Sequence, residues 1–193
     1  MIYGGYMLDV FPGVYKPCDD SYLLADNLRV REGDKVLDMG TGCGLQGLVA
    51  SSKARRGISS DISKRALKCA AHNARRNRVT NIQLIESDLF RNIRGKFDLI
   101  AFNPPYLLTD PLEQGDEHAR AWDGGKDGLR VISEFIGGVK DHLTPKGRVQ
   151  MIVSSMGGIE ATMQLFEEAG LKARIETKKC FSFEELALIE TRL

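Results

Sequence analysis

The sequence predicts a doubly wound α/β fold, in which helices cover both faces of a mostly parallel sheet. Short β-rich runs alternate with helical patterns along the chain, as they do in consecutive βαβ units. A glycine-rich turn joins one of these strands to the helix after it, and no repeat, low-complexity tract or linker interrupts the alternation. The length of 193 residues fits one ordinary domain, so we expect a single domain over residues 1–193.

Seven runs have the composition of strands. Five of them alternate with helical patterns, whereas the last two follow one another near the C-terminus and would add an edge to the sheet. The predicted strands are Lys35–Met39, Gly57–Asp61, Ile82–Ser87, Phe97–Asn103, Arg148–Val153, Lys172–Thr177 and Leu186–Thr191.

The clearest helix follows Ser63, whose hydroxyl suits an N-cap position. Five residues after it recur at a helical spacing and mark one buried face, namely Ala66, Leu67, Ala70, Ala71 and Ala74. The other helices are predicted at Asp20–Leu28, Leu45–Lys53, Gly128–His142 and Ile159–Ala169.

The composition is that of a globular chain. Its 27 Lys and Arg residues balance 26 Asp and Glu residues to a net charge of +1, and 42% of the residues are hydrophobic. These values exclude a disordered, collagen-like or coiled-coil protein. No apolar run approaches the roughly 20 residues that span a bilayer, and residues 1–10 lack the pattern of a signal peptide. We therefore expect a cytoplasmic protein without a membrane partner.

Neither the cysteines nor the histidines form a metal-binding pattern. The four cysteines are spaced 25, 26 and 111 residues apart, so we expect free thiols and no bound metal. Charge is uneven along the chain, with nine basic and one acidic residue in 53–78, and six acidic and two basic residues in 109–127. The basic stretch is either a solvated helix face or a docking patch for an acidic partner or nucleic acid.

The glycine-rich turn contains Gly40, Gly42 and Gly44, and it lies between a predicted strand and a predicted helix. Glycine permits positive φ and lets a ligand approach the backbone closely. Asp61 ends the next strand, 21 residues after Gly40, where a carboxylate can accept hydrogen bonds from ribose hydroxyls. Together these residues predict a site for a nucleoside cofactor.

Two further carboxylates indicate which cofactor this site binds. Asp38 lies two residues before Gly40 and would repel a pyrophosphate by on the order of 4 kcal/mol at a separation of about 4 Å and an effective dielectric of roughly 20. The same carboxylate would favour an ammonium and a sulfonium, which indicates S-adenosylmethionine rather than NAD. Asp88, after the third strand, is placed to meet the adenine amino group or, alternatively, to cap a helix.

A buried strand runs directly into Asn103-Pro104-Pro105-Tyr106. Two prolines end the strand and remove two N–H donors, so the surface becomes rich in hydrogen-bond acceptors. The Asn103 side-chain oxygen, the Pro104 carbonyl and the flat face of Tyr106 would suit a planar –NH₂ group. The alternative is a strand-ending turn in which Asn103 is a local cap. Nearby Trp122 either shapes the substrate pocket or anchors its own loop.

Several of these segments, taken in order, resemble the HemK-like protein-(glutamine-N5) methyltransferases that modify class-1 peptide-chain release factors. The similarity is closest to the short branch of eukaryotes and archaea, which lacks a separate N-terminal helical domain. It runs from about Val14 to near the C-terminus. The segments that carry it are Val14–Ser21, Val36–Gly44, Ser60–Ile62, Ser87–Leu89, Asn103–Tyr106 and Ala121–Gly128.

The resemblance implies a Rossmann-like fold of the class I S-adenosylmethionine-dependent methyltransferases, with seven strands and with residues 1–30 packed over the cofactor site. It implies that the residues contacting the cofactor are Ser21, Asp38, Gly40, Gly42, Gly44, Asp61, Asp88, Leu89 and Asn103. It also implies that Asn103, Pro104, Pro105 and Tyr106 bind the acceptor, and that Asn103, Pro104 and Tyr106 carry the catalysis.

The resemblance further implies that the acceptor is the glutamine in the Gly-Gly-Gln loop of a class-1 release factor, which gives a role in translation termination. Relatives in the short branch also work with a small zinc-binding activator protein that pairs with the sheet edge, for which Ile82–Ser87 is the candidate strand. Enzymes that methylate adenine N6 or guanine N2 share the Asn-Pro-Pro-Tyr signature, so a nucleic-acid amino methyltransferase is the alternative. The acidic residues after the signature disfavour a nucleic-acid partner because they would repel phosphates.

Overall fold

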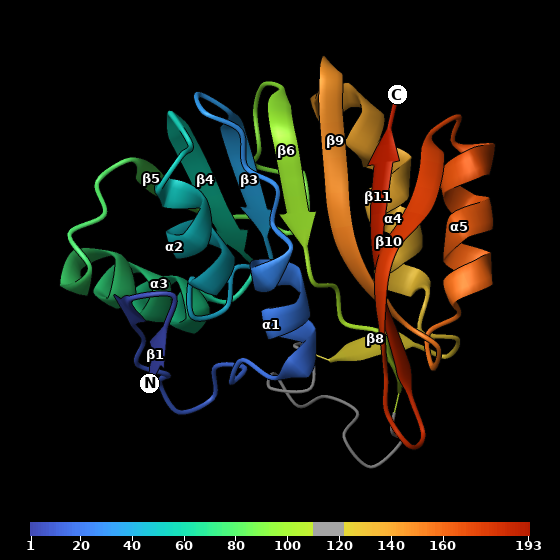
Figure 1. Ribbon diagram of the computed structural model, residues 1–193, viewed down its shortest axis with the longest axis horizontal. Helices are drawn as coiled ribbons and strands as arrows, with labels where there is room; N and C mark the ends of the chain where they lie inside the picture. Colours follow the sequence, from blue (N-terminus) through green and yellow to red (C-terminus); the bar gives the residue numbers. More distant parts are fainter. Residues whose placement is uncertain (110–121) are drawn as a thin grey trace.

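A seven-stranded sheet forms the centre of the computed structural model, which describes residues 1–109 and 122–193 (Figure 1). The first five strands in chain order pair in parallel, whereas β11 runs antiparallel between β9 and β10. The predicted fold class and all seven predicted strands are therefore confirmed. In spatial order the strands are β10 (Lys172–Cys180), β11 (Glu185–Arg192), β9 (Leu143–Ser154), β6 (Phe97–Phe102), β3 (Lys35–Met39), β4 (Arg56–Asp61) and β5 (Ile82–Glu86).

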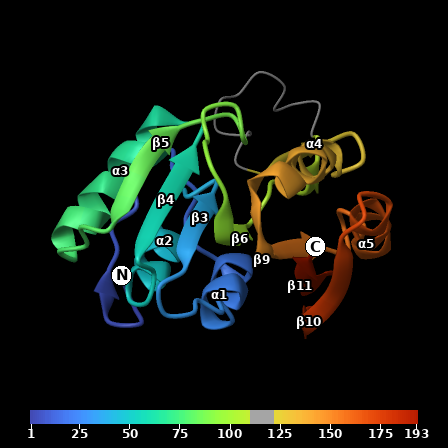
Figure 2. The ribbon, with the colours of Figure 1, turned by 90° about the horizontal axis from the view of Figure 1, so that it is seen from above.

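Helices cover both faces of this sheet, with α1 and α2 on one side and α4 and α5 on the other (Figure 2). The bounds are α1 (Asp19–Asp26), α2 (Leu45–Ser51), α3 (Lys64–Arg76), α4 (Arg130–Val139) and α5 (Ile159–Glu168). The five predicted helices are thus present, with ends shifted by a few residues. Ser63 caps α3 as expected, because its hydroxyl accepts a hydrogen bond from the backbone N–H of Ala66.

Four very short strands were not predicted. They form two small two-stranded sheets, one at the N-terminus and one beside the end of β6. Two or three residues are too few to show the alternation by which a strand is recognised. Their bounds are β1 (Ile2–Tyr3), β2 (Tyr6–Met7), β7 (Leu107–Leu108) and β8 (Asp123–Gly125).

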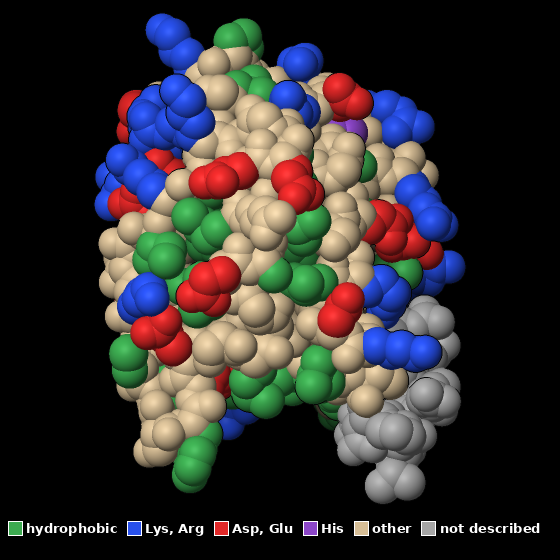
Figure 3. Space-filling view, turned by 90° about the vertical axis from the view of Figure 1, so that its right-hand side faces the viewer, with side chains coloured by type: hydrophobic (Ala, Val, Ile, Leu, Met, Phe, Trp, Pro, Cys, Tyr) green, Lys and Arg blue, Asp and Glu red, His purple; other side chains and the backbone are tan. Residues whose placement is uncertain are grey.

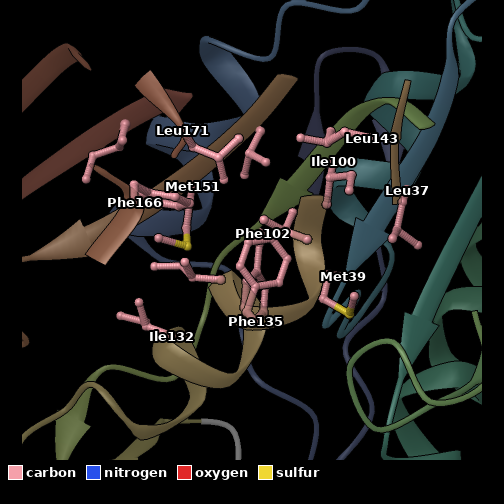
Figure 4. Packing of buried hydrophobic residues seen from close by; sticks show 14 of the residues in the cluster. Leu37, Met39, Ile100, Phe102, Ile132, Phe135, Leu143, Met151, Phe166 and Leu171 are labelled. Atoms are coloured by element: carbon pink, nitrogen blue, oxygen red, sulfur yellow. The ribbon is translucent and has the colours of Figure 1, made fainter. Parts of the chain in front are cut away.

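Strand β6 shows how the two hydrophobic layers arise. Its side chains alternate, so Leu99 and Ala101 pack on the side of α1 and α2, whereas Ile100 and Phe102 pack against α4 and α5. The rings of Phe102 and Phe135 lie 4.7 Å apart between their centroids, at the centre of the larger layer (Figure 4). This packing fixes the position of the end of β6, where the predicted acceptor turn begins.

The N-terminal segment is tied to α3 by two asparagines. The side chain of Asn73 accepts from the N–H of Asp9 at 2.9 Å and donates to its carbonyl at 2.8 Å. Asn77 pairs in the same way with the backbone of Met7, at 2.8 and 2.7 Å. Each side-chain amide thus bonds to both the N–H and the C=O of one backbone residue, as a neighbouring strand would. These bonds hold the N-terminal segment beside the carboxyl ends of the parallel strands (Figure 1).

The surface over α5 and β10 carries charges of both signs (Figure 3). Several of them form ion pairs, such as Lys178 with Glu185 at 2.7 Å. All four cysteines of the chain are free thiols. In the described parts of the chain, no helix has the length and apolar character needed to cross a membrane.

The central packing predicts a large loss of stability for Phe135→Ala, because this ring is fully buried and contacts both Phe102 and Phe90. We expect the free energy of unfolding, measured in urea by circular dichroism, to fall by about 3–5 kcal/mol. Phe183→Ala removes the same ring from a side chain that is 96% exposed, and should change stability by less than about 0.5 kcal/mol. Equal losses in the two variants would contradict this packing.

Candidate active site

A cavity of about 1320 Å³ lies at the carboxyl ends of β3, β4 and β6. This is the edge of an open α/β sheet at which ligands bind. Most of the predicted site residues line the cavity, whereas Asp38 and Gly44 do not. Those on its wall are Ser21, Gly40, Gly42, Asp61, Asp88, Leu89, Asn103, Pro104, Pro105 and Tyr106.

The glycine loop follows β3 and has the backbone geometry that the sequence predicted. Gly40 and Gly42 have φ values of 64° and 54°, which residues with a side chain adopt only with strain. A Cβ atom at Gly40 would lie 3.4 Å from the ring of Phe102, whereas one at Gly42 would meet nothing within 4 Å. The loop thus packs on β6 on one side and presents bare backbone to the cavity on the other.

Asp38 lies behind this loop and is only 2% exposed. Its Oδ2 atom accepts hydrogen bonds from the Thr41 hydroxyl, the Gly47 N–H at 3.0 Å and the Ser59 hydroxyl at 3.2 Å. Burial raises the pKa of Asp38 to about 7, although these three donors act in the opposite direction. The structure therefore places this carboxylate where it organises the loop, rather than on the cavity wall where we expected it.

Gly44 also supports the loop from outside the cavity. It has a φ of 92° and precedes the first residue of α2. A Cβ atom here would lie 3.1 Å from the Cβ atom of Ala70 in α3. The glycine therefore allows α3 to approach the start of α2 closely.

Asp61 lies on the cavity wall and joins two structural elements. Its Oδ2 atom accepts from the N–H of Gly42 at 2.9 Å, and its Oδ1 atom accepts from the N–H of Ser63 at 2.8 Å. Burial raises the pKa of this carboxyl group, against the effect of the backbone donors. The carboxylate thus ties the glycine loop to the start of α3 while facing the cavity.

Asp88 and Leu89 follow β5 on the same wall. The Asp88 carboxylate forms an exposed ion pair with Arg91 at 3.2 Å. It does not cap a helix, because a turn follows it, so the alternative interpretation of Asp88 is wrong. Leu89 has a positive φ of 44°, and its carbonyl accepts a hydrogen bond from the Ser87 hydroxyl at 2.7 Å.

The Asn103–Tyr106 turn forms the opposite wall. The Oδ1 atom of Asn103 is buried and has no hydrogen-bond partner among the residues that the structure describes. Pro104 is buried, and the Tyr106 hydroxyl donates to Asp20 at 3.2 Å. Burial and the nearby Asp20 charge raise the pKa of Tyr106 far above its usual range, so this side chain is a neutral phenol.

Sequence reasoning missed two residues around this turn. Tyr15 and Asp20 line the cavity beside Ser21, and their side chains are joined by a hydrogen bond of 2.9 Å. The two consecutive aspartates before Ser21 were a visible signal, but the sequence does not show which of them is buried. Trp122, for which the sequence left a pocket role and an anchoring role open, also lines the cavity. Ala121 and most of the acidic stretch, residues 110–121, lie outside the described residues.

A mostly parallel seven-stranded sheet, a glycine loop after its central strand and an Asn-Pro-Pro-Tyr turn at the same edge together define a class I methyltransferase. The model of the methyltransferase small domain matches residues 12–181, and the chain belongs to this family. Within it, the chain is a short HemK-like protein of the archaeal and eukaryotic type.

Two relatives and one solved structure are similar to this chain over most of their length. A Methanocaldococcus jannaschii protein that is assigned as an N5-glutamine methyltransferase is 41% identical, over 96% of this chain and 94% of its own length. Mouse methyltransferase HEMK2 is 30% identical, over 89% of this chain and 86% of its own. The solved Mtq2–Trm112 complex of E. cuniculi, which methylates the termination factor eRF1, is 24% identical with a TM-score of 0.73, covering 93% of this chain and 98% of that one.

The raised pKa of Asp38 predicts a pH dependence of stability. Folded Asp38 has a pKa of about 7, whereas an unfolded aspartate titrates near 3.9. Between these values only the folded state holds the proton, so rising pH lowers the free energy of unfolding. Relative to Asp38→Asn, we expect the wild type to lose up to about 4 kcal/mol between about pH 4 and pH 7. Urea unfolding across this range measures the difference, and parallel pH profiles would contradict it.

Proposed function

We propose that this protein transfers a methyl group from S-adenosylmethionine to the side-chain amide of the glutamine in the Gly-Gly-Gln loop of a class-1 release factor. The observation that carries the proposal is the buried, unpaired Oδ1 atom of Asn103 on the cavity wall. No protein donor among the described residues occupies this oxygen, so it can accept a hydrogen bond from an entering N–H group, with a net contribution of about 0.5–1.5 kcal/mol.

The cavity fits S-adenosylmethionine. Gly40 and Gly42 present backbone without side chains, and the carboxylates of Asp61 and Asp88 can accept hydrogen bonds from ribose hydroxyls and an adenine amine. Ser21 and Leu89 would complete the binding surface. When bound, S-adenosylmethionine supplies an electrophilic methyl group on a sulfonium.

Two residues that do not line the cavity would act on the cofactor indirectly. Asp38 holds the glycine loop through three hydrogen bonds, and Gly44 lets α3 approach the start of α2. We therefore assign both to the shape of the loop instead of to direct contact.

The Asn103–Tyr106 turn would orient the acceptor amide. Pro104 and Pro105 have no N–H groups, so the turn offers the Asn103 Oδ1 atom and the Pro104 carbonyl to the two amide hydrogens. The ring of Tyr106 offers a flat face to the amide plane. Correct orientation of two reactants can contribute about 7–11 kcal/mol, whereas each neutral hydrogen bond contributes about 0.5–1.5 kcal/mol. Orientation should therefore dominate, and the neutral Tyr106 has no role as a base.

The comparisons support a protein acceptor over a nucleic acid. The relative that is 41% identical is assigned to glutamine N5, and the E. cuniculi complex acts on eRF1. Translation termination takes place in the cytoplasm, where we place this protein.

We expect Asn103→Ala to reduce methyl transfer to the release factor by at least about 100-fold, because the amide loses its orientation. Transfer is measured with methyl-labelled S-adenosylmethionine and mapped to the loop glutamine by mass spectrometry. Asn27→Ala removes another asparagine, one that bonds to the carbonyl of Leu23 and does not line the cavity, and should remain active. Full activity of Asn103→Ala would overturn the mechanism, whereas label only on tRNA or DNA would overturn the acceptor.

We further propose that a small, zinc-binding activator protein of the Trm112 type pairs with the free edge of β5. This strand is last in the sheet order, as the sequence predicted. The carbonyl of Asn81 and the N–H of Ser87 bond to β4. In a parallel ladder the N–H and C=O groups of one residue point to the same neighbouring strand, and those of the next residue point the other way. The N–H and C=O groups of Ile82, Leu84 and Glu86 therefore point away from β4. An added strand could pair with these groups.

The outward direction of Leu84 makes this pairing testable. Leu84→Pro removes an outward N–H without removing a bond to β4, so the domain should fold but lose binding to the activator by about tenfold or more. Leu84→Thr keeps the N–H while shortening the side chain, and should retain more of the affinity. Titration with a purified Trm112-type protein by calorimetry measures both. Equal affinities of the proline variant and the wild type would contradict pairing at β5.

A further inference from the structure

A buried carboxylate lines the cavity beside the acceptor turn and takes no part in the chemistry outlined above. Asp20 is the second residue of α1 and is 4% exposed. Its Oδ2 atom accepts hydrogen bonds from two tyrosine hydroxyls, that of Tyr15 at 2.9 Å and that of Tyr106 at 3.2 Å. One oxygen atom thus joins the N-terminal segment, α1 and the acceptor turn.

The surroundings of Asp20 suit a negative charge. The residue lies in the first turn of α1, where the unpaired backbone N–H groups of a helix favour an anion. The Ser21 hydroxyl donates to its other oxygen, Oδ1, at 3.0 Å. With hydroxyl donors on both oxygens, the carboxylate is an acceptor for Tyr106, and hydrogen bonds to a charged group are stronger than neutral ones.

The other end of Tyr106 is enclosed by two glycines. A Cβ atom at Gly128 would lie 2.6 Å from the Tyr106 carbonyl oxygen, and one at Gly157 would lie 3.1 Å from the Tyr106 Cβ atom. The backbone of Tyr106 is therefore in close contact with two neighbouring segments, while its hydroxyl is bound to Asp20. The ring is held at both ends.

We propose that Asp20 is a positioning residue that fixes the ring plane of Tyr106 against the acceptor amide. The inference rests on the proposed function, since it concerns the acceptor wall of the same cavity. Because the Tyr106 hydroxyl is bound to Asp20, the acceptor meets the face of the ring and not its hydroxyl. Both oxygens of Asp20 already accept from hydroxyl groups, so Asp20 acts on the acceptor through Tyr106.

Tyr3 supplies a matched control. Its hydroxyl donates to Asp26, another carboxylate of α1, and neither residue lines the cavity. Tyr3→Phe and Tyr106→Phe each remove one hydroxyl from a carboxylate of α1 while keeping the ring. Only the second change should release the ring that faces the acceptor.

The first test is a double-mutant cycle on methylation of the release factor. We expect Tyr106→Phe and Asp20→Ala each to lower kcat/KM for the acceptor about 10-fold or more, the effect of losing a hydrogen bond to a charged group. Tyr3→Phe should change it less than about twofold, and the Asp20→Ala, Tyr106→Phe double variant should be no worse than either single one. Asp20→Asn, which keeps an acceptor oxygen, should recover part of the loss. The proposal would be overturned if the loss of kcat/KM in the double variant equalled the product of the two single losses, or if Asp20→Ala kept full activity.

The second test does not depend on activity. In protein labelled with fluorotyrosine, the Tyr106 resonance, assigned by its absence in Tyr106→Phe, should broaden or shift in Asp20→Ala as the ring gains motion. The same resonance should be unaffected by Tyr3→Phe. An unchanged resonance in Asp20→Ala would overturn the positioning role. If the resonance changes in Asp20→Ala but the wild-type protein transfers no methyl group to a release factor, the positioning role is supported and the proposed function is refuted. The failure of one proposal can therefore be distinguished from the failure of the other.

Discussion

One oxygen atom, Oδ2 of Asp38, determines the geometry on which the rest of the site depends. It accepts hydrogen bonds from the glycine loop, the start of α2 and strand β4. The contact is close, because a Cβ atom at Gly47 would lie 2.3 Å from the Ser59 hydroxyl oxygen. A buried carboxylate is costly unless it is well bonded, so these donors are constrained to their positions. The cavity wall thus owes its shape to a group that does not touch the cavity.

The spacing between the two walls comes from the pairing of β3 with β6. Met39 is in register with Phe102, so the glycine loop and the Asn103–Tyr106 turn leave the sheet side by side. The ring of Phe102 supports both, since it packs beneath Gly40 and directly precedes Asn103. The backbone pairing of β3 with β6 therefore places the proposed cofactor surface beside the proposed acceptor surface, whichever side chains the two turns carry.

The sequence was sufficient for the seven strands of the central sheet and for the long helices, because alternation, helical spacing and the Ser63 cap are local signals. It was insufficient for the carboxylates. Asp38 is the last residue but one of β3 and Asp61 is the last of β4, and these positions do not reveal that one lies behind the loop and the other on the cavity wall. Asp88 also comes just after a strand, and only the turn that follows it in the structure excludes a role as a helix cap. Asp20 escaped notice because its partner Tyr106 is 86 residues away along the chain.

The polar groups on and behind the cavity wall divide into two kinds. Asp38 and Asp61 have several donors each, which gives rigid walls. In contrast, Asn103 and Gln46, which both line the cavity, each have a buried oxygen without a partner among the described residues. An oxygen that no protein donor occupies can accept a hydrogen bond from an entering N–H group, with a net contribution of about 0.5–1.5 kcal/mol. This hydrogen bond is available to a donor of the right geometry, as a planar amide is, and it is lost to any acceptor without an N–H group.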